Sequence, residues 1–235
     1  MADISILGSV ASAHDVNVSS LPVSYTMPTG SDREMYAIVA QGWFDAGDKV
    51  DSVKINGIDF TLVDTAPATN TIFRVLTVWR LLETSFPADG TYNVVADFGE
   101  AVAGVASIFV FTINNSDQAT LEDKDIYSSG GSTTSSFTVD TLTANAAIFT
   151  ATMHDGLGSY THGSGQNEIF DTQVNRTTSI TVTASYEIIA SSGSNTQTDV
   201  YSGGSDKMCG VVWVVKNKVA SGSSRKNKMT TLGVA

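Results

Sequence analysis

One stretch in the first third of the chain, VKINGIDFTLV at residues 53–63, limits the choice of fold more than any other. Asn56 and Gly57 separate two runs in which apolar and polar residues alternate. Such alternation is typical of a β-strand with one buried face, because successive side chains point to opposite sides of a sheet. Asn-Gly tolerates the positive φ angles that a two-residue type I′ turn needs at both central positions. The stretch therefore predicts a tight β-hairpin.

The predicted turn also fixes which residues face each other across the hairpin. The expected pairs are Ile55 with Ile58, Val53 with Phe60, Lys54 with Asp59, and Ser52 with Thr61. The first two pairs are apolar and the last two are polar, so one face of the hairpin belongs in a core and the other in solvent. A slip of one residue would turn Ile55 and Phe60 toward water.

Strand signals recur along the rest of the chain, and helical periodicity is nearly absent. The apolar or alternating runs lie at residues 16–27, 35–44, 50–55, 58–63, 72–82, 87–98, 104–113, 135–140, 145–154, 179–189 and 209–215. Gly, Asn and Asp stand between these runs, as they do at the turns of antiparallel sheets. We predict an all-β protein: an antiparallel, jelly-roll-like β-sandwich of about a dozen strands.

We predict that residues 1–220 form a single β-sandwich domain, built from two halves that join near residues 116–127; two small domains are the alternative. The joining segment, SDQATLEDKDIY, is the only helix-like stretch, because Ser116 and Asp117 could cap one or two helical turns. A crossover loop is the alternative. The closing strand VVWVV at 211–215 is apolar on both faces, which favours a central position in a sheet shared by the two halves.

Three further segments have the composition of loops or tails. Residues 154–168 are rich in glycine and are predicted to form a long loop, a place where function often resides. The stretch SSGSNTQTD at 191–199 is predicted to be another loop. Residues 221–235, which include SGSSRKNK, are predicted to form a basic C-terminal arm.

Charge is distributed unevenly along the 235 residues, whose net charge is −11. Residues 1–206 contain all 24 acidic residues and seven basic ones, whereas residues 207–235 contain six basic residues and no acidic one. The acidic body argues against broad contact with nucleic acid. Arg225, Lys226 and Lys228 are candidates for contact with an acidic partner surface; a solvated terminus is the alternative.

The single cysteine excludes an intrachain disulfide. Cys209 precedes the apolar run VVWVV, so we expect a buried and inert thiol. The first residues lack the basic region of a signal peptide, and no stretch approaches the roughly 20 apolar residues that span a bilayer. We expect a soluble protein made in the cytosol, with no membrane partner and no cofactor.

Two candidate sites for chemistry fall in the Gly-rich segment. Ser164 lies in HGSGQ close to His162, but the esterase pattern G-x-S-x-G and its following helix are not present. A hydrolase would need this segment to bring serine and histidine together. His154, Asp155 and His162 could also meet at a metal ion, although their spacing matches no zinc signature. A polar loop without chemistry is the alternative for both patterns.

Two further candidates lie near the end of the run at 35–44. Asp45, Asp48 and Asp51 place three carboxylates in one turn, and oxygen ligands suit calcium, but the spacing is not that of an EF-hand. Trp43 and Phe44 stand at a strand end and could stack on a sugar ring. By contrast, Trp79 and Trp213 lie within apolar strands and are expected in the core. The alternative for the aspartates is a solvated turn.

The order of these motifs resembles a recurrent β-sandwich family from tailed-bacteriophage structural genes and phage-like bacterial loci. The resemblance rests on INGIDFTLV, IFRVLTVWRLL, PADGTYNVVADF and GVASIFVFTI, followed by GGSTTSSFTV, a Gly-rich loop and VVWVV, and it covers roughly residues 35–215. Trp79, Phe109 and Trp213 match core positions of the family pattern. The pattern contains no catalytic residue.

The resemblance implies a non-enzymatic component of a virion. We expect a capsid decoration or minor head protein that binds neighbouring subunits, among them the major capsid protein and copies of itself, through loops and termini. A tail, fibre or baseplate component is the alternative within the family, and a carbohydrate-binding module using Trp43 and Phe44 is the alternative outside it. The negative charge favours a position away from packaged genome, because like charges repel.

Overall fold

The computed structural model describes residues 3–44, 50–67, 73–176, 178–204 and 206–218. In these ranges seventeen strands and one short 3₁₀ turn, η1 (Glu83–Ser85), form four antiparallel sheets. The predicted all-β class and antiparallel sandwich are confirmed; the jelly-roll type stays a prediction, as do the domain limits 1–220 and 221–235. No helix in the ranges described is long and apolar enough to cross a membrane.

The first half of the chain forms two sheets. Its strands are β1 (Ser5–Val16), β2 (Ser20–Thr26), β3 (Glu34–Phe44), β4 (Ser52–Ile55), β5 (Ile58–Asp59), β6 (Thr61–Pro67), β7 (Phe73–Leu82), β8 (Thr91–Asp97) and β9 (Val105–Asn114). The first inner sheet has the order β1-β9-β3-β7-β6, and the first outer sheet has the order β2-β8-β4-β5.

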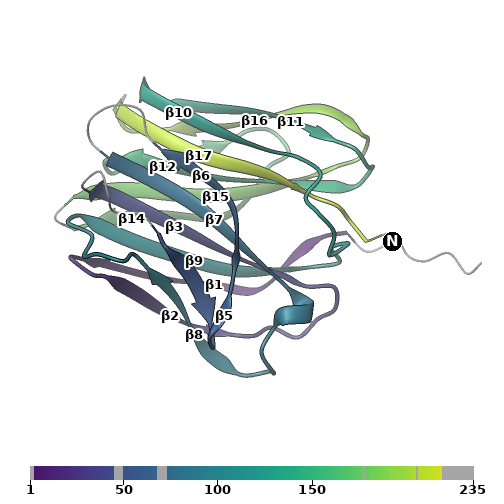
Figure 1. Ribbon diagram of the computed structural model, residues 1–235. Coiled ribbons are helices and arrows are strands. Elements are labelled where there is room, and N and C mark those ends of the chain that lie inside the picture. Colours follow the sequence, from purple (N-terminus) through teal and green to yellow (C-terminus); the bar gives the residue numbers. More distant parts are fainter. Residues whose placement is uncertain (1–2, 45–49, 68–72, 177, 205, 219–235) are drawn as a thin grey trace, which may run out of the picture.

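The second half forms two more sheets. Its strands are β10 (Lys124–Ser132), β11 (Thr134–Thr141), β12 (Ala146–Asp155), β13 (Tyr160–His162), β14 (Asn167–Asn175), β15 (Ser179–Ile189), β16 (Gly193–Tyr201) and β17 (Asp206–Val215). The second inner sheet has the order β10-β17-β12-β15-β14, and the second outer sheet has the order β11-β16-β13. Figure 1 shows the stack from β11 and β16 at the top to β2 and β8 at the bottom.

The two halves repeat one strand order. The eight strands β1–β4 and β6–β9 can be matched, in chain order, with the eight strands β10–β17. With this matching the two inner sheets have the same strand order, and β2-β8-β4 of the first outer sheet corresponds to β11-β16-β13 of the second. Only β5 has no counterpart among the strands described. Each half therefore pairs its own inner and outer sheet. The expected sheet shared by both halves is not found: β17 is central, as predicted, but its neighbours β10 and β12 belong to its own half.

The halves meet through their inner sheets. Alternate residues of the inner strands point into a common apolar core, where Tyr36 and Phe111 of the first half meet Phe149 and Trp213 of the second. The ring centres of Tyr36 and Trp213 are 5.3 Å apart, and those of Phe149 and Trp213 are 5.4 Å apart. Such aromatic pairs contribute about 0.5–1.5 kcal/mol beyond area burial. This core makes one stack of the four layers.

Polar residues border the common core at both ends of β7. The pattern FRVLTVWRLL puts Arg74 and Arg80 on the face that contacts the second half. Arg74 forms an ion pair with Asp155 of β12, which links the halves. Arg80 binds the fully buried Glu34 through Nε–Oε2 and Nη2–Oε1 contacts of 2.7 and 2.5 Å. Buried charges are tolerated here because each has a partner of opposite sign.

The predicted hairpin is confirmed. Asn56 and Gly57 have φ angles of 49° and 78°, and Ile55 pairs with Ile58 in the predicted register. Lys54 forms an exposed ion pair with Asp59 across the strands, with an N–O distance of 3.3 Å.

The hairpin ladder is nevertheless shorter than expected. Ile55 is fully buried and Phe60 is 5% exposed, and the Phe60 amide still donates to the Val53 carbonyl. From Thr61 the chain crosses to the first inner sheet, where Thr61 pairs with Arg80. Thr61 therefore pairs with β7, and the predicted pairing with Ser52 is not formed.

Several predicted loops are strands in the structure. The segment at 116–127 forms no helix: it runs beside the end of β17 and enters β10 at Lys124. The predicted loop at 154–168 contains β13 and the start of β14, and the one at 191–199 forms most of β16. Together with β1, these elements raise the number of strands above a dozen. Their sequences are polar because they lie at sheet edges or on the polar interior described below.

Candidate functional site

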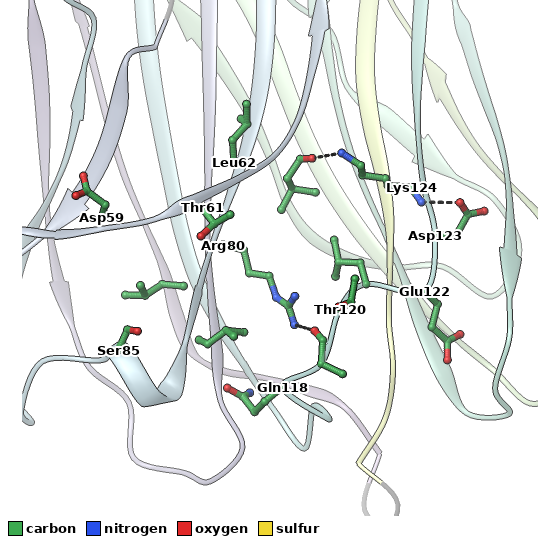
Figure 2. Close-up of a pocket in the computed structure, with 15 residues that line it drawn as sticks. Asp59, Thr61, Leu62, Arg80, Ser85, Gln118, Thr120, Glu122, Asp123 and Lys124 are labelled. Atoms are coloured by element: carbon green, nitrogen blue, oxygen red, sulfur yellow. Dashed lines mark hydrogen bonds between the residues drawn. The ribbon is translucent and has the colours of Figure 1, made fainter.

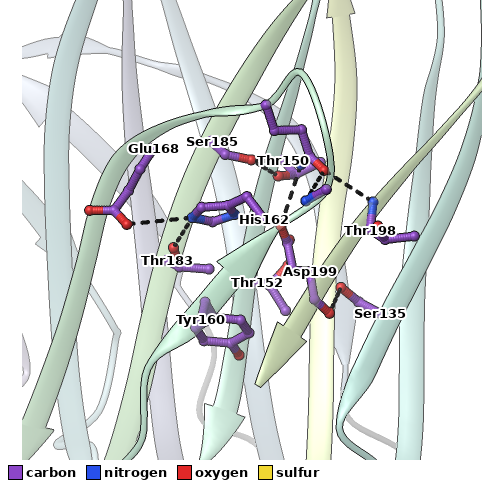
Figure 3. Close-up of polar contacts among 12 residues, drawn as sticks. Ser135, Thr150, Thr152, Tyr160, His162, Glu168, Thr183, Ser185, Thr198 and Asp199 are labelled. Atoms are coloured by element: carbon purple, nitrogen blue, oxygen red, sulfur yellow. Dashed lines mark hydrogen bonds and ion pairs between the residues drawn. The ribbon is translucent and has the colours of Figure 1, made fainter. Parts of the chain in front are cut away.

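A polar cluster lies between the two sheets of the second half. It arises from alternation along β15: Val182 and Ala184 face the common core, whereas Thr181, Thr183 and Ser185 face the second outer sheet. All five are buried. We call the group formed by Thr150, Thr152, His162, Gln166, Thr183, Ser185 and Asp199 the His162 cluster (Figure 3).

His162, the last residue of β13, joins the two sheets. Its Nδ1 lies 2.7 Å from Oδ1 of Asp199 on β16, and its Nε2 lies 3.3 Å from Oγ1 of Thr183 on β15. The Thr183 hydroxyl donates its proton to the Phe170 carbonyl at 2.8 Å, so it accepts from His162. A carboxylate only accepts. Both ring nitrogens are therefore assigned as donors, and the ring is an imidazolium.

Asp199 is the centre of the cluster and is fully buried. Its Oδ2 accepts a hydrogen bond from Oγ1 of Thr152 on β12 at 2.8 Å. Its Oδ1 accepts from His162 and, at 3.4 Å, from Nε2 of Gln166. A buried carboxylate is tolerated when it is paired with a cation and supplied with donors, and both conditions are met here.

The charges around His162 act on its pKa in opposite directions. Burial by itself lowers the pKa, but the hydrogen bond and charge of Asp199 raise it, and the Glu168 and Asp171 carboxylates on β14 add to that rise. Taken together, these effects raise the pKa of His162 above its ordinary value. Glu168 Oε2 lies 3.8 Å from the His162 Nε2 atom. The pKa direction and the hydrogen-bond geometry agree on a protonated ring.

Tyr160 stands beside the cluster at the start of β13. Its amide donates to Oδ2 of Asp171 at 2.9 Å, which ties β13 to β14. Burial, followed by the negative charge of Asp199, raises the pKa of the Tyr160 phenol well above its ordinary value. The phenol oxygen and Oδ1 of Asp171 are buried without a hydrogen-bond partner.

The side chains of Asp199, His162 and Thr183 are hydrogen-bonded in the order of a catalytic triad, but they do not have its chemistry. The Thr183 side chain is fully buried, and its proton is committed to the Phe170 carbonyl. Both ring nitrogens of His162 are occupied, so the ring is not placed as a base for Ser164, which is exposed in the next turn. The arrangement fastens two sheets; it presents no nucleophile.

The predicted metal-site residues are not brought together. His154 is buried, stacks on Tyr201 with ring centres 3.8 Å apart, and directs Nδ1 and Nε2 to the carbonyls of Asp155 and Ser132 at 2.6 and 3.1 Å. The Asp155 carboxylate is paired with Arg74, and His162 belongs to its own cluster. In the described part of the chain, no group of three His, Cys, Asp or Glu side chains could hold a metal ion.

A groove lies on the opposite edge of the stack, where β6 and the end of β7 face the crossover at 118–124 (Figure 2). Its volume is about 710 Å³. Arg80 lines it, bound to Glu34 and donating to the Ala119 carbonyl at 2.7 Å. Lys124 borders it and pairs with Asp64 at 2.9 Å. The remaining lining residues are Asp59, Thr61, Leu62, Val63, Leu81, Leu82, Ser85, Gln118, Thr120, Leu121, Glu122 and Asp123.

Most other sequence candidates lie at the limits of the described residues. Trp43 and Phe44 end β3, where the Phe44 backbone is in register with Phe73, but their side chains lie outside the described part of the structure. Asp45 and Asp48 also lie outside it. Asp51 is exposed, and its amide donates to the Asp97 carbonyl at 2.8 Å. The basic residues Arg225, Lys226 and Lys228 are outside the described ranges.

The predicted core residues are confirmed. Trp213 and Phe109 are fully buried, and Trp79 is 7% exposed with its Nε1 donating to Thr77 at 2.8 Å. Cys209 is fully buried, and burial raises the pKa of its thiol to about 12, so it is inert near neutral pH.

Sequence reasoning missed the partners of His162. Asp199 closes the stretch predicted to be a loop, and Thr183 lies in a strand expected to be ordinary. One signal was available: the run SITVTAS at 179–185 alternates apolar and hydroxyl residues, which indicates a strand whose second face is polar. Comparisons with protein-family models, curated proteins and solved structures found no match to this chain.

Proposed function

We propose that this protein is a non-enzymatic structural component of a tailed-bacteriophage particle: a capsid decoration or minor head protein that binds neighbouring subunits. The resemblance over residues 35–215 supports the proposal. A four-layer stack held by one common core suits a subunit that must keep its shape in an assembly. A tail, fibre or baseplate position is the second form of the same proposal.

The observation that carries the proposal is where the two ends of the described chain lie. Asn115 accepts a hydrogen bond from the Lys218 amide through its carbonyl at 2.8 Å. The side chain of the same residue donates to the Asp3 carbonyl at 2.8 Å. Asp3 and Lys218, the ends of the described chain, therefore lie at one place, next to the crossover that lines the groove. Segments that leave a rigid body together can contact one neighbouring subunit.

The basic residues at this end of the molecule favour an acidic partner. Lys216 and Lys218 are paired with Asp117 and Asp32. Residues 219–235 add three basic residues and no acidic one, and residues 1–206 of any neighbouring copy carry a strong excess of acidic residues. Complementary charge steers association and sets register between subunits. An acidic subunit surface is therefore the partner chemistry that we propose for Arg225, Lys226 and Lys228.

The test is incorporation into particles. The variant R225E/K226E should reduce the number of copies per purified particle by tenfold or more, measured by quantitative mass spectrometry. The control K54E/R176E makes the same change in net charge at positions far from residues 219–235 in the sequence and should be incorporated normally. Equal occupancy by the two variants would overturn the proposed role of the basic segment.

A glycan array separates the binding-module alternative from the virion proposal. The wild-type protein and a Trp43→Ala variant would be compared on the same array. Binding that disappears with Trp43→Ala, together with no copies in particles, would replace the virion proposal by a carbohydrate-binding one.

A further inference from the structure

β13 is a very short element that depends on side chains for its position. Its three residues pair only with β16: Tyr160 with Tyr201, Thr161 with Val200, and His162 with Asp199. A three-residue ladder at the edge of a three-stranded sheet is weak by itself. Gly156 and Gly165, both with positive φ angles, lie in the turns on either side of it.

His162 adds a charged attachment to the hydrogen bonds that Tyr160 and Gly156 make with Asp171 and Thr181. Through Asp199 it is bound to the outer sheet, and through Thr183 it is bound to the inner sheet beneath. Asp199 itself reaches the inner sheet at Thr152. Figure 3 shows the His162 ring between β14, β15 and β16, with both nitrogens in contacts. The side chain therefore fastens the β13 segment to two other strands and to both layers.

Only one charge state of His162 satisfies all these contacts. A neutral ring keeps a single N–H, so it can donate either to Asp199 or to Thr183, but not to both. Deprotonation also leaves the buried Asp199 carboxylate without its cation, which is unfavourable at low dielectric. The contacts are complete only while the ring carries its second proton.

We propose that His162 and Asp199 form a proton-operated clasp, which holds residues 156–166 against the second sandwich when His162 is protonated and lets them open when it is not. Tyr160 of this segment packs on Tyr201 and Met208, and opening would separate it from them. The clasp is independent of the proposed function, since it needs no partner.

All charged groups that face His162 favour the closed state. Asp199 approaches from β16, and Glu168 and Asp171 approach from β14. The contact from β15 is the neutral Thr183 hydroxyl. The titratable neighbour on β13 itself, Tyr160, is neutral. The raised pKa sets the range: the clasp is closed below the ordinary histidine value of 6.5 and opens as pH rises through the higher folded value.

Amide hydrogen exchange tests the clasp. Exchange of the amides of Thr161, His162 and Gly163, corrected for the intrinsic pH dependence, should rise between pH 6 and pH 9. The rise should be about tenfold for each pH unit by which the closed-state pKa of His162 exceeds its open-state value. Nitrogen NMR of labelled histidine should show both His162 nitrogens protonated at pH 6. A neutral His162 at pH 6, or exchange that does not depend on pH, would overturn the clasp.

Two variants separate a clasp from a merely structural contact. Thr183→Val keeps the shape but removes the acceptor, so the midpoint of the rise should move to lower pH. The control Thr181→Val removes a hydroxyl of the same strand that donates to the Gly156 carbonyl at 2.9 Å, without touching His162. It should raise exchange at every pH and leave the midpoint unchanged. Equal midpoints in both variants would count against the clasp.

Discussion

The two halves share one strand order but differ in the space between their inner and outer sheets: the first has a large apolar core, whereas the second combines a smaller apolar cluster around Phe137 and Val212 with buried polar residues. In the first half, β8 contributes the fully buried Val94 and Ala96 to an apolar core. In the second half, the matching strand β16 contributes the buried Gln197 and Asp199. The contrast also holds on the inner sheets: β7 presents Val75, Trp79 and Leu81 with one hydroxyl residue, Thr77, whereas β15 presents Thr181, Thr183 and Ser185.

This difference shows that the arrangement of strands does not require an entirely apolar interior. Apolar burial stabilises without direction, so Val94 and its neighbours tolerate small shifts. A hydrogen-bonded interior is directional, and each group needs its partner in place. The second sandwich therefore has a more specific geometry and a dependence on pH that apolar contacts alone would not give.

The largest expected effect is in neither interior but in the common core that joins them. Trp213→Ala should lower the free energy of unfolding by about 4 kcal/mol, because it removes a fully buried ring packed on both Phe149 and Tyr36. Urea denaturation measures this loss. Val200→Ala is the control: because Val200 is 44% exposed, this variant should change the free energy of unfolding little. A loss below about 1 kcal/mol would mean that the halves do not depend on this core.

Removing one side of the buried ion pair should have the next largest effect. Asp199→Ala should lower the free energy of unfolding by about 3 kcal/mol, since it removes the buried counter-ion of His162 and leaves the Thr152 donor without a partner. The double variant H162L/D199V should recover most of that stability, because it makes the second interior resemble the first. If the double variant is as unstable as the single one, the apolar interior is not interchangeable between the halves.

A third and smaller effect is that a histidine in each half makes the stability of the fold depend on pH, with opposite signs in the two halves. Burial, and then the charge of Arg176, lower the pKa of His14 on β1, whereas the pKa of His162 is raised. His14 therefore stabilises the fold above pH 6.5, and this contribution is lost as pH falls below that value. His162 stabilises it below pH 6.5, and this contribution is lost as pH rises through the folded pKa.

Unfolding midpoints between pH 5 and pH 9 check both signs. His14→Gln should weaken the loss of stability on the acid side only, and His162→Gln should weaken the loss on the alkaline side only. A change on the same side in both variants would contradict the assignment of the two charges.

The smallest expected effect is at the surface of the first half. Lys54→Ala removes the exposed ion pair with Asp59, whose two side chains are 43% and 66% exposed. Such pairs contribute about 0.2–1 kcal/mol, and solvent screening places this one at the lower end. Thermal unfolding at low and high salt would measure it. A loss comparable to that of Asp199→Ala would show that exposure does not separate the two kinds of ion pair.

Local pattern was sufficient wherever a strand has one strongly apolar face. The Asn56-Gly57 turn, the register of Ile55 with Ile58, and the burial of Trp79, Phe109 and Trp213 could be predicted because each depends on alternation and turn chemistry within a few residues. The strands β1, β10, β13, β14 and β16 were missed because their polar and small residues have weak strand signals. Tertiary pairing overrides such weak local preferences.

The sequence by itself determined that the chain is an antiparallel β protein with Trp79 and Trp213 buried, because the period of the side chains and the glycine turns act locally. Only the tertiary structure decided that the strand order is repeated and that His162 meets Asp199 and Thr183. Those residues lie 37 and 21 positions from His162, on different strands. Their meeting depends on how β13, β15 and β16 are placed across two sheets. That placement follows from packing of the whole chain, since no local rule sets the register between distant strands.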